Sequence, residues 1–127
     1  MNLEKVIFAF FIVFAATLNF GFFIGDIDRP ELHNIYELFA AIVVNIIATI
    51  LKFGDRTQIG AVLLSTSLVA DIQLVAAALV WTFAAHVTGT GMTSEIIASV
   101  VSLSGGALLA NIISVIMLIV ETVLMRR

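Results

Sequence analysis

Four long apolar stretches, separated by short polar breaks, constrain the fold of this chain more than any other feature of its sequence. Each stretch is long enough for the roughly 20 residues that a membrane-spanning helix needs. Hydrophobic residues make up 61% of the 127 residues and charged residues only 12%, whereas a soluble domain has about 25% charged residues. A soluble fold of this size could not cover so much apolar surface. The sequence therefore predicts an integral membrane protein.

The polar breaks divide the chain into four predicted helices that form a single transmembrane domain over residues 1–127. We expect the helices at about residues 6–24, 32–53, 57–87 and 93–125. The break at residues 54–56 is so short that the helices on either side of it must run antiparallel. The first segment is interpreted as a retained helix, because it is longer than a typical signal-peptide core and no A-x-A-like cleavage site follows it. The predicted fold is all-α, a four-helix transmembrane bundle with short loops.

The basic residues predict how the bundle is oriented. Lysine and arginine near helix ends stay on the cytoplasmic side of a membrane. Five of the six basic residues fall at one end of the predicted bundle: Lys5, Lys52, Arg56, Arg126 and Arg127. Only Arg29 falls at the other end. We therefore expect both termini in the cytoplasm.

The outer end of the bundle is expected to be acidic. Its predicted loops and helix ends carry five acidic residues: Asp26, Asp28, Glu31, Glu37 and Glu95. With Arg29, these five acids give the outer end a net charge of −4, which would concentrate cations near this membrane surface. The alternative is that acidic residues are simply tolerated on the outer side.

Asp71 lies almost midway along the third predicted helix. A carboxylate near the centre of a membrane costs at least about 2.5 to 3.5 kcal/mol on insertion scales, so it should face protein or water and it suggests a functional site. Asn45, Gln73 and Asn111 are expected at a similar depth, and Ser67 precedes Asp71 by one turn on the same helix face. These five residues can bind an ion or a proton through carboxylate and amide oxygens. They can equally form a structural network of hydrogen bonds that holds the helices together.

Small residues recur at every fourth position of the fourth predicted helix. Such spacing lets another helix approach closely, which predicts either an oligomer interface or tight packing within the bundle. The residues concerned are Ala98, Ser102, Gly106, Ala110 and Ser114, with a shorter version of the pattern at Gly21 and Gly25 in the first helix.

Other kinds of site are disfavoured by the sequence. His33 and Glu37 have a spacing that suits metal ligands, but a metal site needs more than two ligands, so we predict no metal site and solvation of both residues at the membrane interface. No phosphate-binding glycine loop, H-E-x-x-H helix or G-x-S-x-G turn occurs, and the absence of Cys excludes thiolate chemistry. We therefore predict that the protein is not an enzyme and uses no cofactor. An isoelectric point of about 5.1 and the lack of a basic patch argue against binding to nucleic acid.

Two local motifs carry a resemblance to a family of membrane proteins. The first helix ends in Asn19-Phe20-Gly21 followed by Gly25-Asp26-Ile27-Asp28, and Lys52-Phe53-Gly54-Asp55-Arg56 joins the second helix to the third. With these motifs, the chain resembles an uncharacterised family of small four-helix bacterial inner-membrane proteins. The resemblance covers most of the chain and implies a location in the bacterial inner membrane, without a known activity.

Two functions remain open from the sequence. In the first, several copies of the chain assemble around an axis into a cation- or proton-conducting channel or carrier, in which Asp71 binds the ion with help from Asn45, Gln73 or Asn111. In the second, the chain is a non-catalytic accessory or structural subunit of a larger membrane complex, and its polar centre serves only packing. The expected partners are the lipid bilayer, further copies of this chain and, in the second case, a larger membrane protein.

Overall fold

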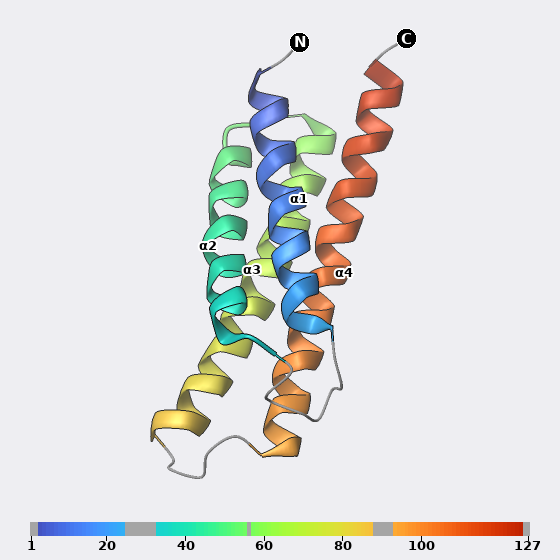
Figure 1. The fold of residues 1–127 in the computed structure, drawn as a ribbon. Helices are drawn as coiled ribbons and strands as arrows, with labels where there is room; N and C mark the ends of the chain where they lie inside the picture. Colours follow the sequence, from blue (N-terminus) through green and yellow to red (C-terminus); the bar gives the residue numbers. More distant parts are fainter. Residues whose placement is uncertain (1–2, 25–32, 56, 88–92, 126–127) are drawn as a thin grey trace.

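The computed structural model describes residues 3–24, 33–55, 57–87 and 93–125. These residues form four α-helices (Figure 1), namely α1 (Leu3–Phe23), α2 (Ile35–Lys52), α3 (Gln58–Thr82) and α4 (Ser94–Met125). A π-helical turn, η2 (Phe83–Val87), extends α3. All four helices are long and apolar enough to cross a membrane. The prediction of an all-α, four-helix membrane protein is confirmed.

Polar side chains determine where three of the helices begin. Asn34 Oδ1 accepts a hydrogen bond from Tyr36 N (2.9 Å) at the start of α2, Thr57 Oγ1 accepts one from Gly60 N (3.0 Å) at the start of α3, and Thr93 Oγ1 accepts one from Ile96 N (3.2 Å) at the start of α4. Each bond satisfies a backbone donor that has no partner inside the helix. The described part of α2 therefore starts three residues later than the apolar run predicts.

Helix α1 starts earlier than predicted, whereas the described part of α2 starts later. Helix α1 begins at Leu3, three residues before the predicted start, and so includes the charged residues Glu4 and Lys5. An acidic residue in the first turn is stabilised by the positive end of the helix dipole, so a helix can continue beyond its apolar run into the membrane interface.

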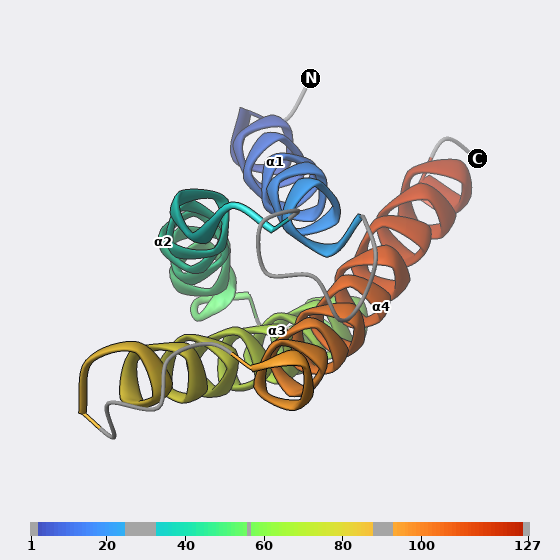
Figure 2. The same ribbon diagram turned by 60° about the horizontal axis from the view of Figure 1, so that its bottom comes forward.

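The four helices pack in a ring in which each helix has two neighbours. Helix α1 packs on α2 and α4, and α3 packs on α4 and α2, as seen along the bundle in Figure 2. Helices α1 and α4 have their chain-terminal ends on the same side, where α2 also ends and α3 begins. We call this side the terminal end and the opposite side the far end. At the far end, α3 and α4 extend past α1 and α2 (Figure 1).

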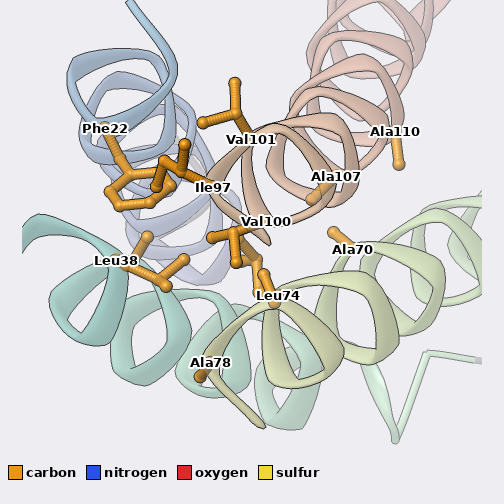
Figure 3. Packing of buried hydrophobic residues seen from close by; sticks show 12 residues of the cluster. Phe22, Leu38, Ala70, Leu74, Ala78, Ile97, Val100, Val101, Ala107 and Ala110 are labelled. Atoms are coloured by element: carbon orange, nitrogen blue, oxygen red, sulfur yellow. The ribbon is translucent and has the colours of Figure 1, made fainter. Parts of the chain in front are cut away.

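The buried core consists of two apolar clusters, one toward each end of the bundle. In the far cluster, Phe22, Leu38, Leu74 and Val100 point toward a common centre from four different helices (Figure 3). The cluster nearer the terminal end contains Phe8, Ile12, Ala48, Leu63 and Leu118.

Buried polar residues separate the two apolar clusters on three of the helices. We call these residues the polar layer: Asn45 on α2, Ser67 on α3, and Asn111 and Ser114 on α4. Along each helix they lie between residues of the far cluster and residues of the terminal cluster. The polar layer therefore crosses the middle of the bundle.

Candidate functional site

Asp71 lies on α3 beside the polar layer, half-buried and bound by two side chains of α2. Its Oδ1 accepts a hydrogen bond from Asn45 Nδ2 (2.5 Å), and its Oδ2 accepts one from Thr49 Oγ1 (2.6 Å). Asn45 and Thr49 are four residues apart and therefore project from the same face of α2. Both donors are uncharged, so these two bonds orient the carboxylate without neutralising it.

The two donors of Asp71 are themselves held in place. Asn45 Nδ2 also donates to the backbone oxygen of Ser67 (3.2 Å), so both hydrogens of the amide have acceptors on α3. Thr49 Oγ1 lies 2.9 Å from the backbone oxygen of Asn45, so its single proton is shared between the backbone and the carboxylate. This arrangement fixes the position of Asp71 relative to α2.

Several atoms of the polar layer are buried without a hydrogen-bond partner among the described residues. They are Asn45 Oδ1, Ser67 Oγ and both amide atoms of Asn111, and all three residues have no exposed surface. An unsatisfied buried polar group costs about 1 to 3 kcal/mol, whereas a hydrogen bond between transmembrane helices contributes only about 0.6 kcal/mol on average. Helix association alone is therefore a weak explanation for this layer.

Ser114 differs from the other residues of the polar layer because its hydroxyl is bonded across a helix interface. Its Oγ shares a hydrogen bond with Thr66 Oγ1 on α3. This contact aligns α3 with α4 at the depth of the polar layer.

The structure divides the five residues predicted to form the polar core between different interfaces. Asn45, Ser67 and Asp71 come together where α2 contacts α3, although Ser67 takes part through its backbone oxygen and not its hydroxyl. Gln73 instead lies over α4, because a Cβ added to Gly106 would overlap Gln73 Oε1. Asn111 is buried on α4 and makes no side-chain hydrogen bond to another described residue.

Part of the small-residue pattern of α4 is used inside the bundle. Gly106 receives Gln73, Ala110 belongs to the far cluster, and Ser114 bonds Thr66. Ala98 is half-buried and Ser102 is exposed. In α1, Gly21 packs under the carboxylate of Glu37, and Gly25 lies outside the described residues.

The predicted outer acidic residues are described only in part. Glu95 is exposed in the first turn of α4, at the far end, and Glu37 is half-buried against Gly21. Asp26, Asp28 and Glu31 lie outside the described residues. No group of three or more metal-binding side chains occurs among the residues that the structure describes.

The predicted solvation of His33 is wrong. His33 has an exposed fraction of only 4%, and its Nδ1 lies 2.5 Å from the backbone oxygen of Phe22. Its ring also contacts the Phe22 ring, at 5.5 Å between centroids. The aromatic contact and the backbone oxygen together provide an environment in which the imidazole can be buried.

The sequence pattern did not single out two buried polar residues, Thr49 and Asn19, that bond neighbouring helices. Thr49 could have been found from its spacing, because it lies one turn after Asn45. Asn19 is buried in the phenylalanine-rich α1; with its amide oriented to suit its neighbours, it donates to Ser104 O (3.0 Å) and accepts from Leu108 N (2.9 Å). Asn19 therefore ties α1 to α4.

Comparison with known proteins places this site within a recognised sequence family. The sequence model of a family of unknown function (DUF6394) matches residues 32–122. The matched region includes Asn45, Thr49, Asp71 and the whole polar layer, whereas α1 lies outside it. Neither the curated proteins nor the solved structures provide a match to the chain.

Proposed function

This chain belongs to the DUF6394 family of unknown function, and we propose that it forms a homo-oligomer that binds and moves a proton or a small cation at Asp71. The observation that carries this proposal is the position of the Asp71 carboxylate. It lies in the middle of a membrane-spanning helix, beside the polar layer, and it is oriented by two uncharged donors.

The partial exposure of Asp71 supports an oligomer. Leu68 and Val75, one turn before and one turn after Asp71, are exposed on the same side of α3. A carboxylate in this position is too costly to leave facing lipid, so its exposed side should be covered by protein or water. A second copy of the chain, related by symmetry, would cover this face.

The oxygen atoms near Asp71 suit the binding of a cation. The carboxylate and the hydroxyl of Thr49 are oxygen groups of the kind that replace the hydration shell of a cation. Asn45 Oδ1 is a third such group, and it has no hydrogen-bond partner among the described residues. A proton needs only the carboxylate. In both cases the bound charge would enter and leave through the oligomer, and the protein would act without catalysis or a cofactor.

Flux into liposomes tests the proposal. Purified protein is reconstituted, and the fluxes of protons, Na⁺ and K⁺ are measured separately for the wild type and for Asp71→Asn. Asparagine has nearly the same shape, can accept from Asn45 and can donate to Thr49, so it removes the charge with little change in packing. Glu95→Gln is the comparison variant, because it neutralises an exposed acid at the far end, where the loss of one charge would weaken the attraction of cations but would not remove their binding site.

We expect the wild type and Glu95→Gln to conduct one of the ions, and Asp71→Asn to lose flux by more than about tenfold while its oligomer size stays the same. Unchanged flux in Asp71→Asn would contradict the role of Asp71 as an ion site.

An accessory or structural subunit is the second candidate, and one observation favours it. Both oxygens of Asp71 already accept hydrogen bonds from α2, so the residue can serve as a clamp between α2 and α3. In that case a well-folded wild-type protein carries no flux in liposomes, and a second polypeptide copurifies with it. Asp71→Asn would then be nearly neutral in all assays, since asparagine can keep both contacts.

A further inference from the structure

An apolar groove runs between α1 and α4 and reaches the charged residues Lys5 and Glu121 only at its terminal end. Its apolar part is a cavity of about 480 Å³ lined by residues such as Ala16, Phe20 and Ile112. The next cavity, of about 280 Å³, shares Val13 and Val115 with the first and reaches Lys5 and Glu121. We call these two joined cavities the α1–α4 groove.

A third cavity lies at the terminal end, beside the ion pair between Lys5 and Glu121. Lys5 and Glu121 line this third cavity too, which has a volume of about 680 Å³. Figure 1 shows α1 and α4 diverging toward the terminal end. An apolar groove that ends at charged residues fits an amphiphilic ligand.

At the terminal end of the α1–α4 groove, Lys5 provides a positive charge and Glu121 a negative charge. Lys5 Nζ lies 3.0 Å from Glu121 Oε2, and 36% of the lysine side chain is exposed. The second carboxylate oxygen, Oε1, is buried and accepts no hydrogen bond from the described residues. Lys52, also at this end, has a side chain that is only 7% exposed, and it is ion-paired with Asp55 (3.3 Å) and lies over the Phe8 ring. The groups at the end of the groove are thus a partly exposed ammonium and a carboxylate that is 9% exposed and has one oxygen without a donor among the described residues.

We propose that the α1–α4 groove binds a phospholipid whose headgroup carries a primary ammonium. One of its two acyl chains lies along Val13, Ala16 and Val115, its phosphate contacts Lys5, and its ammonium donates to the Glu121 carboxylate. The last torsion of a glutamate side chain is broad, so the carboxylate can turn its unbonded oxygen toward the headgroup. This site is independent of the function proposed for Asp71.

The length of the groove agrees with a bound acyl chain. From Lys5 to Ala16, α1 rises about 16 Å at 1.5 Å per residue. One leaflet contributes about half of a hydrocarbon core that is roughly 30 Å thick. A lipid with its headgroup at Lys5 would therefore extend to about the centre of the membrane beside Ala16.

A comparison of two headgroups tests the site. Wild-type protein in detergent is incubated with equal amounts of phosphatidylethanolamine and phosphatidylcholine with identical acyl chains, and native mass spectrometry measures the lipid that each protein retains. The two zwitterionic lipids differ in that the trimethylammonium of phosphatidylcholine has no N–H donor. We expect about tenfold preference for phosphatidylethanolamine, because hydrogen bonds to charged groups are the strong ones.

Two variants test whether the preference for phosphatidylethanolamine depends on Glu121. Glu121→Gln keeps the side-chain size and removes the charge, and we expect it to reduce the preference to about equal retention of the two lipids. Glu95→Gln, at the far end, should keep the preference of the wild type. Equal retention of the two lipids by the wild type, displacement of phosphatidylethanolamine by phosphatidylglycerol, or an unchanged preference in folded Glu121→Gln would each overturn the proposal. If Glu121→Gln does not fold, the wild-type comparison decides.

Discussion

Asn111 is fully buried in the polar layer, and neither of its amide atoms has a hydrogen-bond partner among the described residues. A buried polar group without a partner costs about 1 to 3 kcal/mol, and leucine has the same number and branching of side-chain heavy atoms as asparagine. We therefore expect Asn111→Leu to raise the free energy of unfolding by about 1 to 2 kcal/mol. The measurement is the thermal unfolding midpoint in detergent.

Asn19→Leu is the matched control for this prediction, because the Asn19 amide bonds Ser104 and Leu108 on α4. Replacing this amide with an alkyl side chain removes both hydrogen bonds between α1 and α4, so this variant should unfold at a lower temperature than the wild type. If Asn111→Leu also unfolds earlier, the Asn111 amide must be bonded in the folded protein. If Asn111→Leu is more stable than the wild type but loses ion flux, the polar layer is needed for function and lowers the stability of the protein.

Depth along a helix was predictable for the polar residues, but the interface that each one faces was not. Asn45 and Asp71 lie near the middle of their apolar runs, and they meet in the structure. Gln73 has a similar depth but points to α4, over Gly106, because two residues span about 200° around an α-helix. When nearly every residue of a helix is hydrophobic, the sequence does not indicate which face of the helix packs against which neighbour. Sequence reasoning could therefore place these residues in one layer without finding their partners.

At the scale of elements, the connection between α2 and α3 is held by Asp55. Its Oδ1 accepts hydrogen bonds from Thr57 Oγ1 (2.7 Å) and Thr57 N (2.9 Å), and its Oδ2 accepts one from Lys52 (3.3 Å). The bonds from Thr57, together with that from Lys52, lower the pKa of Asp55 below its usual value. Ionised Asp55 thus stabilises the start of α3 at neutral pH.

We expect Asp55→Asn to lower the unfolding midpoint at neutral pH and to have little effect in acid. A carboxyl group whose pKa is lowered by folding stabilises the protein above its unfolded-state pKa, and this contribution is lost as the pH falls through the folded-state value. The measurement is the unfolding midpoint in detergent from neutral pH to below the usual aspartate pKa of about 3.9.

Thr57→Ala provides the comparison, because it removes two contacts: the cap on Gly60 N, which does not depend on ionisation, and the hydrogen bond from Thr57 Oγ1 to Asp55, which is strong only while Asp55 is ionised. The loss of the cap costs about 1 kcal/mol and should persist in acid, whereas the part of the Thr57→Ala effect that acts through Asp55 should disappear there. If the difference between Asp55→Asn and the wild type stays constant over the pH range, Asp55 does not act through its charge.

The number and type of the elements could be predicted because the membrane sets the length of a spanning helix. Their ends were less predictable, because capping by Asn34 and the extension of α1 to Leu3 depend on polar residues outside the apolar runs. The π-helical turn after α3 also had no sequence signal beyond the unusual length of the third apolar run. Physical rules for the bilayer therefore predict the interior of each helix better than its interfacial ends.

At the scale of the whole molecule, the arrangement of charge agrees with one part of the predicted orientation. Lys5 and Lys52 line the same cavity at the terminal end, as expected if basic residues gather on one side of the membrane. The cytoplasmic position of this end stays a prediction. The half-buried Asp71, in contrast, lies in the span itself and makes the outward face of α3 the surface that most needs a covering partner.

The outward face of α3 can be tested by disulfide crosslinking, because the chain contains no cysteine of its own. Val75 follows Asp71 by one turn and is 39% exposed, whereas Leu109 is exposed on α4. We expect Val75→Cys to form linked dimers on mild oxidation in membranes, because a disulfide needs Cα atoms within about 7 Å, and we expect Leu109→Cys to stay monomeric. Adding Asp71→Asn to Val75→Cys should preserve the crosslink if Asp71 binds an ion and does not hold the copies together. Efficient crosslinking at Leu109 with none at Val75 would place the interface on α4 and remove the structural basis for an ion pathway at Asp71.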